Sequence, residues 1–218
     1  MLLSDNVATL IHDLKTPIFA QQRILDLLLK NTFGELSAAQ AEIITQIKNS
    51  SIYLENIVSN ALDSYKLNND KLILSPESFN LNEVITSSIE QLTPLAQEKG
   101  LTLALSLSTC TISADKFHLK RVITNLISNA ISYSTQNSQI EVSTKLAQNS
   151  LIFSIKNVSP ISTDLSQVFD KFYSTSNSGL GLHLVKNIIE LHNGNVFAQN
   201  PNQNECVFGF TLPQKSSV

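Results

Sequence analysis

The segment His-Asp-Leu-Lys-Thr-Pro at residues 12–17 places several reactive groups within an otherwise amphipathic helical pattern. An imidazole is largely neutral near pH 7 and offers a nitrogen lone pair, so His12 can act as a nucleophile. Asp13 follows it directly, and Thr16 lies one helical turn further along the same face. Pro17 has no N–H to donate to the carbonyl of Asp13, so we expect the helix to bend or loosen there. An isolated histidine of this kind is more often an ordinary surface residue.

A second polar group lies on a predicted helix from Asp115 to Ser132. At roughly 100° per residue, its apolar residues form one stripe, while Asn125 and Asn129 fall on another. Two side-chain amides four residues apart therefore lie on the same face of the predicted helix. Taken alone, they are also compatible with a solvated helix face.

A third group consists of Gly179 and Gly181, beside Leu180 at the start of a predicted helix that ends near His192. Glycines at the start of a helix let backbone amides approach a phosphate group. A Gly-x-Gly pattern is weak evidence by itself.

The reactive histidine must be positioned by helices. Residues from Ser4 to Tyr65 show helical periodicity, broken once at residues 31–37, where Ser37 is a plausible N-cap. Both helical arms carry an apolar stripe with heptad spacing, so they predict an antiparallel hairpin. Because a lone hairpin cannot enclose its own stripes, we expect a homodimer with a four-helix bundle.

The two later groups belong to a different kind of structure. After a polar stretch at residues 66–71, helical patterns alternate with strand-like ones, and a mixed sheet with helices on one face is expected. The fold class is therefore α+β. A boundary near Leu67 gives two domains, 1–67 and 68–218.

The composition restricts the partners. The net charge is −3 and the basic residues are scattered, so we expect no nucleic-acid partner. No apolar run approaches the roughly 18 residues of a membrane span, so membrane attachment would need a sensor region outside this sequence. Cys110 and Cys206 have no metal-binding spacing and read as reduced thiols of a cytoplasmic chain.

The string HDLKTP resembles the phosphoacceptor box of the sensor histidine kinases of two-component systems, and it matches at every fixed position. The resemblance implies that His12 is the phosphorylated nucleophile and that Asp13 orients it and accepts its proton. Thr16 would help place water when the enzyme removes phosphate from its partner. That partner would be the receiver domain of a response regulator, phosphorylated on an aspartate.

Later segments resemble the family's nucleotide-binding boxes, in the family's order. Residues 125–134 resemble the N box, in which Asn129 would hold Mg²⁺ against the ATP phosphates with help from Asn125. Residues 168–173 resemble the F box, and residues 177–194 the glycine-rich box. The resemblance implies an ATP-binding domain of the type shared with gyrase and chaperone ATPases. It assigns nucleotide contacts to a set spread over the domain: Asn125, Asn129, Tyr133, Asn157, Gly179, Leu180 and Gly181.

These boxes depart from the family pattern at several positions. Ser132 stands where the family has lysine, Asn157 where it has the aspartate that accepts the adenine amino group, and Asn177 where it has a glycine. Two functions therefore stay open. The chain is either an ATP-dependent histidine kinase with weak activity, or a histidine phosphotransferase or pseudokinase whose second domain is a docking surface.

A third class, the ATPase clamps of gyrase and chaperone relatives, fits poorly. Those proteins usually carry a glutamate at the position of Asn125, and they have no hairpin with the HDLKTP string.

Overall fold

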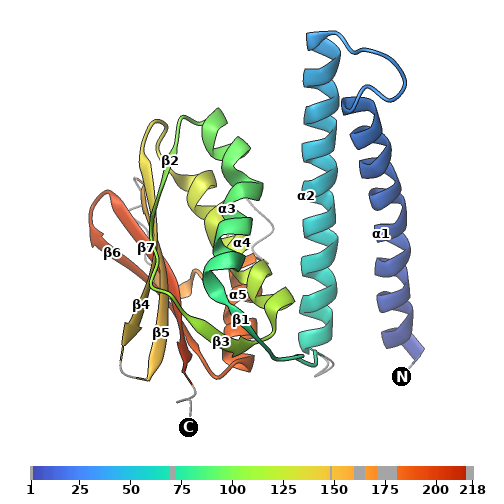
Figure 1. The fold of residues 1–218 in the computed structure, drawn as a ribbon. Coiled ribbons are helices and arrows are strands. Elements are labelled where there is room, and N and C mark those ends of the chain that lie inside the picture. The colour runs from blue at the N-terminus through green and yellow to red at the C-terminus, as the bar shows by residue number, and fades with distance from the viewer. Residues whose placement is uncertain (1, 69–71, 148, 160–164, 171–180, 215–218) are drawn as a thin grey trace. The chain divides into compact units, whose positions relative to one another are not determined.

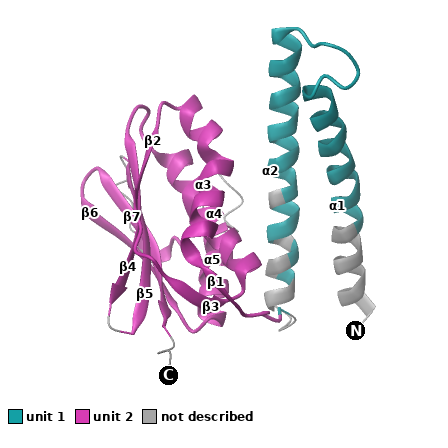
Figure 2. Cartoon of the chain, in the orientation of Figure 1, with its two compact units in different colours: residues 1–72 teal, residues 73–218 magenta. Residues whose placement is uncertain are grey.

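The computed structural model describes residues 2–68, 72–147, 149–159, 165–170 and 181–214 (Figure 1). The side chains of residues 2–12, of several residues between 56 and 68, and of Ser166 lie outside this description. The chain divides into two compact units, residues 1–72 and 73–218 (Figure 2).

The first unit consists of two helices, α1 (Leu2–Leu29) and α2 (Ala38–Asn68). Helix α1 continues through Pro17, so the proline does not end it. Asn31, with φ of 56°, turns the chain after α1 in the left-handed conformation that asparagine tolerates.

A capping box starts α2, as the sequence predicts for Ser37. The Oγ atom of Ser37 accepts the amide of Gln40 at 3.3 Å, and the Oε1 atom of Gln40 accepts the amide of Ser37 at 2.9 Å. The cap fixes where the second arm of the hairpin begins.

Polar contacts between α1 and α2 set how the two helices pair. Lys48 forms an ion pair with Asp26 at 2.6 Å, and the side-chain amide of Gln22 donates to the carboxylate of Glu55 at 3.0 Å. Each link joins one helix to the other. The two helices therefore form the hairpin that the periodicity predicts.

The hairpin leaves much of its predicted apolar stripe uncovered. Leu25 and Ser51 are buried between the helices, with 6% and 1% exposure. Leu14, Ile47 and Leu54 belong to the same stripes but are 47%, 42% and 49% exposed. The hairpin by itself therefore presents an apolar face.

The second unit contains a five-stranded sheet of order β2-β4-β5-β7-β6. Strand β2 pairs with β4 in parallel, and all other neighbours pair antiparallel, which makes the sheet mixed as expected. The strands are β2 (Thr102–Ser106), β4 (Gln139–Ala147), β5 (Ser150–Val158), β6 (Asn195–Asn202) and β7 (Glu205–Pro213).

A second, two-stranded sheet was not expected from the sequence. Strands β1 (Glu77–Asn80) and β3 (Thr111–Ala114) pair antiparallel, with Phe79 opposite Ile112. Each strand has only four residues, too few for a visible alternation of polar and apolar side chains.

Three helices cover one face of the large sheet: α3 (Leu81–Glu98), α4 (Lys116–Tyr133) and α5 (Gly181–Leu191) (Figure 1). Helix α4 packs against both other helices. Its apolar stripe is buried as predicted, and it includes Leu119, Val122, Ile123 and Leu126. On the sheet side, the stacked rings of Phe153 and Phe210 are fully buried.

Among the described residues, no helix combines the length and the apolar character needed to cross a membrane.

Candidate functional site

Asn125 on α4 faces the start of α5. Its Oδ1 atom lies 3.9 Å from the position that a Cβ atom would take on Gly181, the first residue of α5. Its Nδ2 atom is buried and has no hydrogen-bond partner among the described residues. A buried donor without a partner costs free energy, and such groups are rare in folded proteins unless they serve a ligand or a bound water. This arrangement makes the junction of α4 and α5 a candidate binding site.

Two further predicted site residues follow Asn125 on α4. Asn129 lies one turn later and is half-buried, and Tyr133 is the last residue of the helix and also half-buried. The buried stripe of α4 holds the helix against the sheet, so these polar residues lie on its flank. An amide oxygen at Asn129 is a suitable ligand for a hard cation.

Asn157 lies on the sheet, near the end of β5. It is 2% exposed and shares the helix-covered face with the buried residues Phe153 and Ile155. The next carbonyl, that of Val158, accepts the amide of Thr135 at 2.9 Å, just after α4 ends. Asn157 is therefore a buried, neutral polar residue. It directly precedes Val158, the residue of β5 that is hydrogen-bonded to the chain just after α4.

Cys206 is the cross-strand neighbour of Asn157 on β7. Burial raises the pKa of its thiol, so the group stays uncharged near neutral pH. Neither Asn157 nor Cys206 therefore provides the ionised acceptor that an aspartate would.

The glycine-rich and F-box segments are described only in part. Gly179 and Leu180 lie outside the described residues, as do Phe172 and Tyr173 of the F box. Phe169 is buried and packs edge-on against Phe208 of β7, with ring centres 6.4 Å apart. Phe169 therefore packs as a residue of the hydrophobic core.

His183 links α5 to the F-box segment, a role that the sequence did not suggest. The side-chain amide of Asn187 donates to the Nε2 atom of His183 at 3.0 Å. The Nδ1 atom of His183 therefore carries the hydrogen and donates it to the Phe169 carbonyl at 3.4 Å. In the sequence, His183 is only a polar residue in the first turn of an amphipathic helix, so its link to Phe169 could not be predicted.

The predicted phosphoacceptor residues lie together on α1. The backbone of His12 is helical, while its side chain lies outside the description. Asp13 and Thr16 are both exposed and lie one turn apart. The two described members of the cluster are therefore accessible from outside the hairpin.

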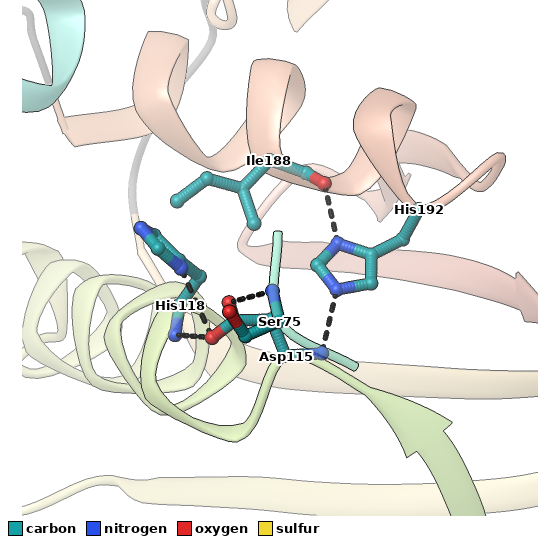
Figure 3. Close-up of polar contacts among 5 residues, drawn as sticks. All are labelled: Ser75, Asp115, His118, Ile188 and His192. Carbon is teal, nitrogen blue, oxygen red and sulfur yellow. Dashed lines mark hydrogen bonds and ion pairs between the residues drawn. The ribbon is translucent and has the colours of Figure 1, made fainter. Parts of the chain in front are cut away.

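Asp115 is the N-cap of α4 and joins three segments (Figure 3). Its Oδ1 atom accepts the amide of His118 at 2.9 Å, and its Oδ2 atom accepts the amide of Ser75 at 2.8 Å. The Nδ1 atom of His118 lies 3.0 Å from the same carboxylate, an ion-pair distance when the ring is protonated. Burial raises the pKa of the Asp115 carboxyl, but the amides of His118 and Ser75 and the His118 ring outweigh this and hold the pKa below its ordinary value.

Asp115 is also joined to the end of α5. Its own amide donates to Nε2 of His192 at 3.0 Å, and Nδ1 of His192 donates to the carbonyl of Ile188 at 2.8 Å (Figure 3). The helix that carries Asn125 and the helix that starts at Gly181 are thus linked by hydrogen bonds at a place distant from both residues.

Residues 114–216 match a family described as histidine kinase-, DNA gyrase B-, and HSP90-like ATPases. The heme sensor protein HssS of Staphylococcus aureus is 28% identical over 211 residues, which cover 94% of this chain and 46% of HssS. The chain therefore spans about half the length of the curated relatives it matches.

Two solved structures share the fold. Full-length ShkA in complex with AMPPNP superposes with a TM-score of 0.73 at 24% identity, over 96% of this chain and 45% of ShkA. The histidine kinase AdeS of Acinetobacter baumannii gives a TM-score of 0.65 at 21% identity, over 94% of this chain and 98% of AdeS. The chain thus shares the α+β fold of these two structures, with helices on a mixed sheet.

Proposed function

We propose that the chain is a sensor histidine kinase that phosphorylates His12 from ATP, because residues 114–216 match the histidine kinase-, DNA gyrase B-, and HSP90-like ATPases and most of the chain is similar to HssS and to the histidine kinase AdeS. The phosphoryl group then passes to an aspartate on the receiver domain of a response regulator. The same hairpin also acts in dephosphorylating that partner.

The observation that carries the proposal is the buried Nδ2 atom of Asn125, which lies opposite Gly181 and has no hydrogen-bond partner in the part of the chain that the structure describes. A phosphate oxygen is an acceptor that suits a buried amide donor. Helix α5 begins at Gly181, beside Asn125, and the free backbone amides of a helix N-terminus favour an anion. The triphosphate of ATP is proposed to lie here, and Asn157 is proposed to accept the adenine amino group.

The residues present are compatible with Mg²⁺. In the part of the chain that the structure describes, no three His, Cys, Asp or Glu side chains cluster as metal ligands. Asn129 offers an amide oxygen beside the proposed phosphate position, and Mg²⁺ commonly combines one or two protein ligands with phosphates and waters. When bound, the cation neutralises phosphate charge, while Asn125 and Asn129 orient the phosphates.

The hairpin supplies the acceptor. His12 is proposed to attack the γ-phosphorus of ATP with one ring nitrogen, which breaks the bond from that phosphorus to the bridging oxygen and releases ADP. Asp13 holds the ring and takes the proton of its other nitrogen. Thr16, exposed one turn further, is proposed to position water for dephosphorylation of the partner. These roles rest on the match of the HDLKTP string to the family pattern.

A homodimer is part of the proposal. Leu14, Ile47 and Leu54 remain between 42% and 49% exposed in one hairpin, although they belong to its heptad stripes. Packing two hairpins into a four-helix bundle would cover these side chains and gain free energy from apolar burial.

The alternative, a phosphotransferase or pseudokinase, is favoured by one observation. Asn157 is 2% exposed and neutral where the family pattern has an aspartate, and a neutral acceptor makes a weaker hydrogen bond than an ionised one. In this alternative, His12 still relays phosphate, and the second unit serves as a docking surface.

A labelling experiment separates the two. The protein is incubated with Mg²⁺ and γ-labelled ATP, and acid-labile, base-stable label is measured on the wild type and on His12→Gln. Label on the wild type that is absent from His12→Gln supports the kinase and excludes the alternative. No label, together with no nucleotide binding by calorimetry, overturns the kinase, and phosphate uptake from a phosphorylated receiver domain would then support the relay.

A further inference from the structure

We propose that His192 is a positioning residue for the nucleotide site, because it accepts the N–H of Asp115 and thereby sets where α5 lies along α4. The inference rests on the proposed site at Asn125 and Gly181. It adds to that site a residue that lies outside it and touches no nucleotide.

The His192 ring can make its two bonds in one tautomer only. A backbone N–H donates, so Nε2 must accept from Asp115, and Nδ1 carries the hydrogen that is donated to the Ile188 carbonyl. The bond to Ile188 ties the ring to its own helix and aims Nε2 at α4 (Figure 3). Rotation of the ring would break both bonds.

Asp115 is a firm attachment point. Its carboxylate caps α4 and is itself held by the amides of His118 and Ser75. The acceptor, one residue after α5, and the donor, at the N-cap of α4, are therefore both fixed by further hydrogen bonds. A change at His192 should consequently act on the two helices and not only on a local side chain.

The hydrogen bond between Asp115 and His192 is separated from the proposed site by about the same length of helix on α4 and on α5. Asn125 follows Asp115 by ten residues, and Gly181 precedes His192 by eleven, which is about 15 Å along each helix. The two contacts thus require α4 and α5 to run antiparallel between them. A shift of α5 along α4 at His192 would alter the gap between Asn125 and Gly181 by a similar amount.

The hydrogen bond acts together with apolar packing. Helix α5 buries Leu184, Val185, Ile188 and Ile189, and close-packed side chains restrict how far it can slide along α4. A hydrogen bond weakens steeply with distance and angle, so the bond from Asp115 to His192 restricts the position of α5 further.

Two substitutions divide the roles of the ring nitrogens. The side-chain oxygen of His192→Gln reaches the place of Nε2 and can accept from Asp115. The side-chain nitrogen of His192→Asn reaches the place of Nδ1 and can donate to Ile188, but this variant cannot reach Asp115. Both replacements are neutral amides, so they form a matched pair.

Binding of a non-hydrolysable ATP analogue with Mg²⁺ to the full chain is measured by calorimetry near 10 °C, where folded proteins are close to their maximum stability. We expect His192→Gln to bind like the wild type and His192→Asn to bind about tenfold more weakly, as the loss of one buried hydrogen bond predicts. Equal affinity of His192→Asn and wild type, or a His192→Gln variant as weak as His192→Asn, overturns the positioning role.

A second readout needs no nucleotide. In amide NMR spectra of the same proteins, the side-chain signal of Asn125 and the backbone signal of Gly181 should shift in His192→Asn and stay in place in His192→Gln. Unmoved signals in His192→Asn overturn the inference. A wild type that binds no nucleotide would instead overturn the proposed function, while these spectra still decide the role of His192.

Discussion

The Oδ1 atom of Asn125 lies at ordinary van der Waals distance, 3.9 Å, from where a Cβ on Gly181 would be, although the two residues are far apart in the sequence. A methyl group on Gly181 would thus fit among the described residues around it. It would at the same time occupy space next to the amide proposed to hold a phosphate.

Gly181→Ala should therefore separate folding from binding. We expect the free energy of unfolding to change by less than about 1 kcal/mol, since the new methyl meets no clash with a described residue and alanine is the better helix former. Nucleotide affinity should fall at least about tenfold, because the backbone at a helix start must come close to the phosphates. Calorimetry and thermal unfolding provide the two measurements.

Gly209→Ala is the matched control. A Cβ there would overlap the carbonyl oxygen of Phe153 and the ring of Phe197. It should cost about 1–3 kcal/mol of stability. A Gly181→Ala variant that is as unstable as Gly209→Ala would contradict the fit described for Gly181.

Asn125→Leu should not destabilise the free protein, in contrast to most replacements of a half-buried polar residue. The substitution removes a buried donor that has no partner among the described residues, and such a donor costs about 1–3 kcal/mol. We expect urea denaturation to give an equal or larger free energy of unfolding, together with loss of nucleotide binding. A variant that binds nucleotide normally would remove Asn125 from the site.

The carboxylate of Asp115 should make stability depend on pH. Its pKa is held below the ordinary value in the folded protein, so its contribution is complete above the unfolded pKa of about 3.9 and is lost as the pH falls through the lower folded value. Urea denaturation at a series of pH values should therefore give a steeper loss of stability below about pH 4 in the wild type than in Asp115→Asn. Identical pH profiles would contradict this role.

Ile47→Asp should weaken self-association. Ile47 is 42% exposed in one hairpin, and in the proposed bundle a carboxylate at this position would be buried without a partner. We expect sedimentation to give a dimer dissociation constant raised at least about tenfold. Phe33→Ser, in the hairpin loop and 72% exposed, removes an apolar side chain outside the stripe and should leave the dimer intact.

Thr16→Ala should divide the two activities of the hairpin. Phosphorylation of His12 should persist, because Thr16 is not the acceptor, while dephosphorylation of the partner receiver domain should slow. Release of phosphate from the phosphorylated receiver is the measurement. Equal rates for both proteins would remove Thr16 from the reaction.

Periodicity alone predicted the longer elements. Helices α3 and α4 and strands β4 and β5 carry repeats of 3.6 and 2 residues over 9 to 18 residues, long enough to be read without tertiary information. The same pattern put Asn125 and Asn129 on the flank of α4, away from its buried stripe.

Contacts between segments distant in the sequence could not be predicted in this way. Strands β1 and β3 are four residues each and exist because they pair with each other. The bond between Asp115 and His192 joins residues 77 positions apart. The match of residues 177–194 to the glycine-rich box includes His192, but it does not indicate which group the ring contacts. The unpaired Nδ2 atom of Asn125 likewise became visible only with the surrounding side chains in place.

The bond from Ser75 to Asp115 affects how the second unit can be excised. The family match begins at residue 114 and the first strand at Glu77, so either would seem a natural starting point for a fragment. Both starting points omit the amide of Ser75 that the cap of α4 accepts. A fragment that begins at residue 73 should therefore melt at a higher temperature than one that begins at 77, even though both contain every strand and helix of the unit.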